Sequence, residues 1–141
     1  MMEQENTNID VDLQTACLHE SRPKIFVVDD EPDVLEVVTA LLEMKGHEVM
    51  AYSDPTEAFA AFMDETVKPN LLISDYQMPK MNGLELLQLC KAEHPALRCI
   101  SASGTLQIDD MQKYVNRPDR FLPKPFRSKQ LWDAVDEMLQ D

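Results

Sequence analysis

Short apolar runs recur along this chain and alternate with longer stretches whose apolar residues are three or four positions apart. Each apolar run has the length of a strand and is bounded by charged residues, glycine or proline, which is typical of strands buried in a sheet. The second run, with a glutamate and a tyrosine at its ends, is more mixed than the others. The predicted strands are 24–28, 48–52, 71–74, 97–102 and 121–123.

The stretches between the strands have the spacing of amphipathic helices. Pro32 is well placed in a first helical turn, and Asp54 followed by proline reads as a cap and a first-turn proline. We expect further helices to begin at Gly83 and, capped by Ser128, near the C-terminus. The segment 107–115 is the weakest predicted helix, because it is short and poor in apolar residues.

Alternation of strands and helices five times predicts an α/β fold, with a parallel sheet covered by helices on both faces. Right-handed crossovers leave few topologies, and the commonest for five strands is the flavodoxin-like order 2-1-3-4-5. In that order the chain reverses direction between strands one and three. Ligands of such sheets bind at this switch point, beyond the carboxyl ends of the strands.

Composition narrows the class of protein. The 141 residues suffice for one domain, and the net charge of -13 disfavours binding to nucleic acid or an anionic membrane through a basic surface. No apolar run approaches the roughly 20 residues of a membrane span, and the N-terminus does not resemble a signal peptide. The three cysteines lack metal-ligand spacing, so free thiols in a cytoplasmic protein are expected. Two of them, Cys90 and Cys99, fall in apolar patterns that predict core positions.

The first 21 residues are acidic and have few large apolar side chains. Such a segment buries too little surface to offset its ordering entropy, so we expect a disordered tail at 1–21 and a folded domain at 22–141. A weak amphipathic turn containing Val11, Leu13 and Leu18 that docks on a partner is the alternative interpretation.

Chemically useful side chains follow four of the predicted strands. Asp29 and Asp30 come after the first strand, Asp75 after the third, Ser103 after the fourth and Lys124 after the fifth. The carboxyl ends of parallel strands meet at one edge of the sheet, so these groups should lie together. For one Asp-Asp pair alone, a solvated acidic loop is the simpler interpretation, but four matched strand ends favour a site.

Three converging carboxylates repel one another unless some are protonated or a cation lies among them. Oxygen ligands without His or Cys favour Mg²⁺, which keeps several waters and seeks phosphate oxygens. With the amine of Lys124 and the hydroxyl of Ser103, the acids would form a cradle for a phosphoryl group. Asp75 would then be the nucleophile and carry an aspartyl phosphate.

Four motifs, in order and at matching spacing, closely resemble the receiver domain of two-component response regulators. The resemblance covers about residue 22 to the C-terminus and rests on Val28-Asp29-Asp30-Glu31, Ser74-Asp75-Tyr76-Gln77-Met78-Pro79 with Gly83, Ser103-Gly104 and Lys124-Pro125-Phe126. It implies that Asp75 is the phosphoacceptor, that Asp30 ligates Mg²⁺ directly and Asp29 mostly through water, and that the backbone carbonyl of Gln77 is a further ligand. Lys124 would be the phosphate partner, with a cis bond to Pro125. Ser103 and Phe121 would be the switch hydroxyl and switch aromatic.

Two positions depart from or complicate the family pattern. Ser101 lies two residues from Ser103 and therefore on the same face of the strand. Ser103 is preferred, because choosing Ser101 would shorten the strand to about four residues. The family often ends its fourth helix with a small-residue turn such as Gly-Ala, whereas this chain has Val-Asn-Arg-Pro-Asp at 115–119.

The resemblance implies a phosphorylation switch that is limited to its own phosphorylation and dephosphorylation, rather than an enzyme in the usual sense. A histidine kinase or histidine phosphotransfer protein would be the donor. The face made by the helix at 107–115, the fifth strand and the last helix would contact the downstream protein, with Trp132 near it.

There are two alternative functions. One is a phosphate-independent docking module, which is expected to lack an acid or the lysine, and the other is a phosphoaspartate hydrolase, which needs an Asp-x-Asp strand and a cap domain. The acids and the lysine are all retained, and neither an Asp-x-Asp strand nor a cap domain is found in this sequence.

Overall fold

The computed structural model describes residues 23–66, 68–104 and 112–140. Strand and helix alternate in this part of the chain much as the sequence predicts. The fourth strand is displaced by one residue from the prediction, and the fifth begins one residue earlier. The elements are β1 (Lys24–Val28), α2 (Pro32–Glu43), β2 (Glu48–Tyr52), α3 (Pro55–Asp64), β3 (Leu71–Asp75), α4 (Gly83–Glu93), β4 (Arg98–Ser103), β5 (Arg120–Pro123) and α6 (Ser128–Leu139).

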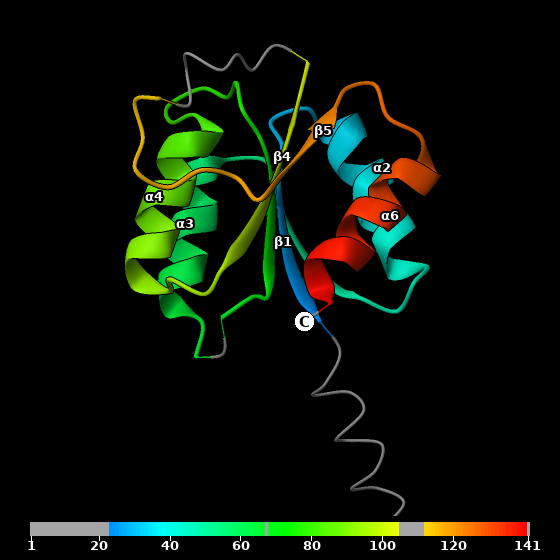
Figure 1. Cartoon of the computed structure of the whole chain (residues 1–141), viewed down its shortest axis with the longest axis horizontal. Helices are drawn as coiled ribbons and strands as arrows, with labels where there is room; N and C mark the ends of the chain where they lie inside the picture. The colour runs from blue at the N-terminus through cyan, green and yellow to red at the C-terminus, as the bar shows by residue number, and fades with distance from the viewer. Residues whose placement is uncertain (1–22, 67, 105–111, 141) are drawn as a thin grey trace, which may run out of the picture.

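The five strands form one parallel sheet in the order β2-β1-β3-β4-β5, which confirms the predicted fold class. Helices α2 and α6 cover one face of the sheet, and α3 and α4 cover the other (Figure 1). The chain thus changes direction between β1 and β3, so the loops that leave these two strands diverge above the same edge. That edge is where the acids were expected.

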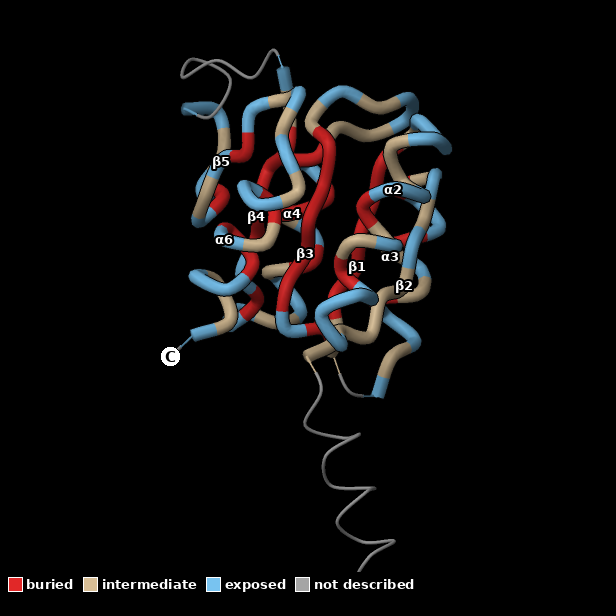
Figure 2. The backbone as a smooth tube through the Cα atoms, turned by 90° about the vertical axis from the view of Figure 1, so that its right-hand side faces the viewer, coloured by how far each residue is buried: buried red, intermediate tan, exposed pale blue. Residues whose placement is uncertain are grey.

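The core has two layers because successive strand residues point to opposite faces of the sheet. Ile25 and Val27 of β1 belong to the layer under α2 and α6, whereas Phe26 and Val28 belong to the layer under α3 and α4. β3 lies at the centre, and all five of its residues are buried (Figure 2). The buried sheet therefore fixes the position of Asp75, its last residue.

Helix starts are set largely by local hydrogen bonds. Asp54 caps α3 by accepting from the amide of Thr56 at 2.8 Å. Asn82 and Glu85 form a reciprocal capping box at the start of α4, with both bonds at 2.8 Å. Ser128 does not cap α6 as predicted. It is the first helical residue, and the extended residue Arg127 before it is the cap.

The segment predicted as the weakest helix, 107–115, falls mostly outside the described residues. Its described end, 112–115, is a turn and bend rather than a helix. This part is tied to α4, because the Gln88 amide donates to the carbonyl of Asn116 at 2.7 Å and accepts from its N–H at 3.0 Å. Asp119, in the loop that departs from the family pattern, accepts from the amide of Cys99 and donates its own amide to the carbonyl of Cys99, each at 2.8 Å.

Trp132 does not lie near the predicted output face. Its indole N–H donates to the carbonyl of Leu41 in α2 at 2.8 Å, and the Lys45 amine lies 4.5 Å from the ring centre. The buried residues of α6, such as Leu131 and Val135, contact the sheet, and the neighbouring position turns toward α2. Trp132 is thus a marker of the contact between α2 and α6.

Three further expectations concern the cysteines, the membrane and the N-terminal tail. Cys90 and Cys99 are free thiols in the core, as predicted. In the described ranges, no helix is long and apolar enough to cross a membrane. The predicted tail at 1–21 lies outside the residues that the structure describes.

Candidate functional site

The carboxyl edge of the sheet carries a depression of about 310 Å³ above β1, β3, β4 and β5. Its lining contains most of the groups that the sequence placed at strand ends, together with Glu31, which the sequence analysis did not assign to the site. The lining residues are Asp30, Glu31, Asp75, Gln77, Ser103, Gly104 and Lys124.

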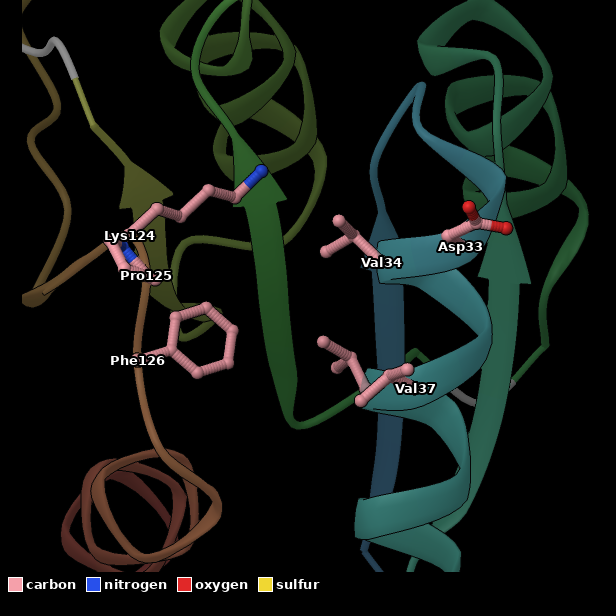
Figure 3. A pocket seen from close by; sticks show the side chains of 7 residues that line it. Asp33, Val34, Val37, Lys124, Pro125 and Phe126 are labelled. Carbon is pink, nitrogen blue, oxygen red and sulfur yellow. The ribbon is translucent and has the colours of Figure 1, made fainter.

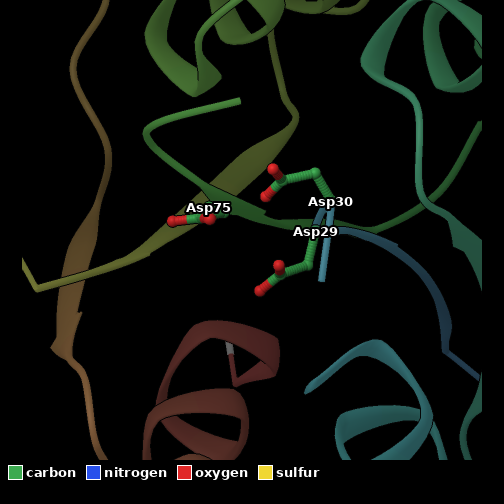
Figure 4. Close-up of side chains that lie close together, drawn as sticks. All are labelled: Asp29, Asp30 and Asp75. Atoms are coloured by element: carbon green, nitrogen blue, oxygen red, sulfur yellow. The ribbon is translucent and has the colours of Figure 1, made fainter. Parts of the chain in front are cut away.

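Asp29, Asp30 and Asp75 come together at this edge (Figure 4). Each offers a carboxylate oxygen, and the three oxygens lie within 4.8 Å of one another. Asp29 is buried, its Oδ1 accepting from the amide of Glu31 at 2.9 Å. Asp75 is also buried, and its Oδ1 accepts from the amide of Tyr76 at 2.8 Å. One oxygen of each is therefore held by the backbone, and the other faces its neighbours.

Lys124 supplies the positive charge opposite these acids. Its Nζ lies 2.8 Å from Oδ2 of Asp29, 3.4 Å from Oδ2 of Asp75 and 3.7 Å from Oε1 of Glu31. The backbone brings it there, because the Lys124 amide donates to the carbonyl of Ser103 at 3.2 Å and the bond to Pro125 is cis, as predicted. The amine thus bridges the acids of β1 and β3.

The electrostatics of the cluster leave an excess of negative charge. Burial, and next the charge of Asp29, raise the pKa of Asp75 against the opposing effect of Lys124. Burial lowers the pKa of Lys124, but its hydrogen bond to Asp29 and the charges of Asp29 and Asp75 outweigh this, so the net effect is upward. One lysine cannot neutralise three close carboxylates. Their oxygen-only donor set fits Mg²⁺.

The loop after β3 is shaped by close backbone contacts. A Cβ on Gly83 would overlap the carbonyl oxygen of Asp75, so this position requires glycine. The Gly83 amide also donates to the carbonyl of Tyr76 at 2.8 Å, which closes the loop. Lys80 has a positive φ of 76°, and its amine is 2.6 Å from Oδ2 of Asp54. Exposed Gln77 is held between these anchors at the rim of the depression.

The two serines of β4 occupy different places. Ser103 is half-buried and lines the depression, whereas Ser101 is buried within the strand and is aligned with Ser74 on β3 and Phe121 on β5. Phe121 is 41% exposed, so its ring lies largely outside the core. The structure therefore brings Ser103, but not Ser101, to the edge that carries the acids.

An apolar groove of about 450 Å³ adjoins the acidic depression and shares Lys124 with it. Val34 and Val37 of α2 form one wall, and Pro125 and Phe126 form the other (Figure 3). Val37 is 56% exposed. Helical periodicity alone does not mark these valines as part of a groove, because the exposure of Val37 depends on how α2 packs against its neighbours.

Comparison with known proteins agrees with this geometry. The family model described as "Response regulator receiver domain" matches residues 25–136. The chain is 27% identical over 119 residues to the DNA-binding response regulator MtrA of Mycolicibacterium smegmatis, covering 84% of this chain and 51% of MtrA. A CheY-like receiver domain protein from Methanospirillum hungatei has a TM-score of 0.77 at 27% identity, over 83% of this chain and 93% of that one. TrrA from Thermotoga maritima, solved in complex with Mg²⁺-BeF, has a TM-score of 0.73 at 25% identity, over 83% of this chain and 99% of the TrrA chain.

The chain belongs to the receiver domain family of two-component response regulators. Members of this family are phosphorylation-controlled signalling switches rather than enzymes in the usual sense, and response regulators interact with histidine kinases. The chain spans about half the length of MtrA, so the properties of that whole protein do not transfer to it directly.

Proposed function

We propose that Asp75 accepts a phosphoryl group, with Mg²⁺ bound by Asp29, Asp30, Asp75 and the backbone carbonyl of Gln77. The observation that carries this proposal is the convergence of three carboxylate oxygens within 4.8 Å beside an amine 3.4 Å from Asp75. Three crowded carboxylates favour a bound divalent cation, and such a cation together with the amine would offset the negative charge of a phosphoryl group on Asp75. The Mg²⁺-BeF complex of the similar regulator TrrA supports the proposal.

The chemistry is a phosphoryl transfer. An oxygen of the Asp75 carboxylate forms a bond to phosphorus as the bond from phosphorus to the donor's imidazole nitrogen breaks, and that nitrogen keeps the electron pair. Bound Mg²⁺ would supply charge neutralisation for the phosphoryl oxygens. Lys124 contributes a second cation, since its amine already lies between Asp29 and Asp75. Ser103 offers its hydroxyl from the lining of the same depression.

The donor is a histidine kinase or a histidine phosphotransfer protein. We place its contact on the apolar groove of Val34, Val37, Pro125 and Phe126, because the groove shares Lys124 with the phosphoacceptor site. A protein that covers the groove brings a phosphohistidine near Asp75 and excludes water from the transfer. Exposed apolar surface next to a charged site is typical of such an interface.

The output is a change in population between two states of the domain. A phosphoryl oxygen on Asp75 gives the Ser103 hydroxyl a new acceptor, and its movement leaves room behind β4 that the exposed Phe121 ring can fill. One charge-assisted hydrogen bond is worth about 1.5–3 kcal/mol, which corresponds to a population shift of roughly ten- to a hundredfold. The surface of β5 and α6, with the segment at 107–115, would present this change to a downstream protein in the cytoplasm, without contact to nucleic acid or membrane.

The test is mass spectrometry of the full chain after incubation with acetyl phosphate. We expect one phosphoryl group in the presence of Mg²⁺, none with EDTA and none in Asp75→Asn. A second measurement is amide NMR with and without the phosphate mimic beryllofluoride. Phe121→Ala and Ser103→Ala should still be phosphorylated, but beryllofluoride should no longer shift their amide resonances around β5. Undiminished labelling of Asp75→Asn would refute the assignment. Labelling without any shift would favour the docking module as the alternative.

A further inference from the structure

β2 forms one edge of the sheet, and among the described strands it pairs with β1 alone (Figure 2). The amide of Glu48 and the carbonyl of Tyr52 bond to backbone groups at the two ends of β1, at 2.9 and 3.1 Å. Backbone polar groups alternate in direction along a strand, so those of Val49 and Ala51 point away from β1. Such an edge is a template for an added strand.

A groove of about 470 Å³ lies between α2 and this edge. Ala40 of α2 and Ala51 of β2 line it and are both exposed, and Leu35 adds apolar surface. Small side chains on both walls leave room for the side chains of a strand that pairs with β2. The groove shares no lining residue with the acidic depression or with the groove of Val34 and Phe126.

The charged residues in the lining of this groove, Glu36 and Glu43, are both acidic. Both are exposed, and neither forms an ion pair with another described residue. They are seven positions apart on α2, which corresponds to about two helical turns or 10 Å along the helix. Two unpaired carboxylates beside an open strand edge favour a ligand with basic side chains.

Charge distinguishes the possible occupants of this groove. A second copy of the chain would bring its own Glu36 and Glu43 to the same interface, and each copy has a net charge of -13. The segment 1–21 of the same chain contains five acids and neither lysine nor arginine, so it is disfavoured for the same reason. A basic segment of a different protein is the occupant that complements this surface.

We propose that the groove between α2 and β2 binds an extended, basic segment of another protein as a sixth strand. The backbone of this segment pairs with Val49 and Ala51, which is a recurring mode of peptide recognition. Side chains four positions apart lie on one face of a strand, about 13 Å from each other. A basic residue at each of these positions reaches Glu36 or Glu43, and a small apolar residue between them lies against the alanines.

This interaction is independent of the phosphoacceptor site. The groove has no residue in common with the depression that contains Asp75, so a partner held here stays bound whether or not Asp75 carries a phosphoryl group. The surface therefore suits a protein that keeps the domain in place rather than one that reads its phosphorylation state.

The experiment is an amide NMR titration of the full chain with a synthetic peptide, Thr-Lys-Thr-Val-Thr-Lys-Thr, blocked at both ends. The peptide should shift the Val49 and Ala51 amides and slow their exchange with solvent, because each gains a hydrogen-bond acceptor. Glu36→Lys/Glu43→Lys should weaken binding at least about tenfold. The matched control is the reversal of two exposed acids with the same spacing on α3, which should leave the affinity unchanged. This control is Glu57→Lys/Asp64→Lys.

A second variant tests the strand pairing separately from the charges. Ala51→Pro removes the outward amide, and proline is tolerated on an edge strand where its nitrogen faces solvent. Binding of the peptide should be lost while the remaining amide spectrum is kept. Undiminished binding would show that the side chains alone hold the peptide, which refutes the added strand.

Four other outcomes would overturn the proposal. A peptide that leaves Val49 and Ala51 unshifted does not bind at this edge. Equal weakening by the α2 and α3 double variants would assign binding to net charge. Slow exchange of the two amides without peptide would show that the same chain covers the edge, or a second copy if the protection rises with protein concentration. Binding that requires Mg²⁺ and beryllofluoride would refute independence from the phosphoacceptor site.

Discussion

Removing the charge of Asp75 should stabilise the protein when no Mg²⁺ is present. Its carboxylate lies within 4.8 Å of those of Asp29 and Asp30, and 3.4 Å from the Lys124 amine. At an effective dielectric constant of about 20, each repulsion is worth about 3.5 kcal/mol and the attraction about 5 kcal/mol. The two repulsions together exceed the attraction. Asp75→Asn, which keeps the shape of the side chain, should therefore raise the free energy of unfolding at pH 7 by about 2 kcal/mol.

The pH dependence of this effect has a definite sign. Burial and the charge of Asp29 raise the pKa of Asp75 in the folded protein. The folded state therefore holds this proton more tightly than the unfolded state does, and ionisation costs stability as the pH rises through the folded pKa. Below the unfolded value of about 3.9 the cost is absent. The difference between parent and Asp75→Asn should shrink as the pH falls toward 4.

Urea unfolding, with EDTA or with Mg²⁺, measures both effects. Mg²⁺ should stabilise the parent, by about 2.7 kcal/mol at a concentration a hundred times its Kd, and should stabilise Asp75→Asn less. Asp136→Asn, which removes an exposed charge on α6, is the matched control and should change little. A metal-free Asp75→Asn that is less stable than the parent at pH 7 would refute the reasoning, since the Lys124 attraction would then dominate.

Three further changes test the surrounding structure. Gly83→Ala should destabilise the fold by about 1–3 kcal/mol in urea unfolding, because the added methyl overlaps a backbone carbonyl; an unchanged midpoint would contradict the contact. Burial raises the pKa of the Cys90 thiol to about 12 and that of the Cys99 thiol as well, so in Cys17→Ser neither should react with Ellman's reagent until the protein unfolds. Asp54→Ala should lower the free energy of unfolding by loss of the α3 cap, whereas Asp54→Asn, which can still cap, should lower it less; equal losses would assign the effect to the ion pair with Lys80 instead.

The sheet and the acidic cluster could be predicted from the sequence because both depend on strand ends. Once Asp29 and Asp75 are known to follow buried parallel strands, topology alone brings them together. Details that depend on side-chain packing could not be predicted in this way. Trp132 was placed on the wrong side of α6, since its partner Leu41 lies 91 residues away in sequence. Ser128 was mistaken for a cap because Ser is a common capping residue, whereas Arg127 is not.

The loop after β3 and the segment before β5 share an anchor on α4. Asn82 caps this helix directly after the loop and donates to the Tyr114 hydroxyl at 3.2 Å, and Gln88, farther along α4, holds both polar groups of the Asn116 backbone. The two segments are thus coupled through helix α4. Because Leu84, Leu86 and Leu87 of the same helix are buried, the core that fixes α4 also fixes the approach to β5.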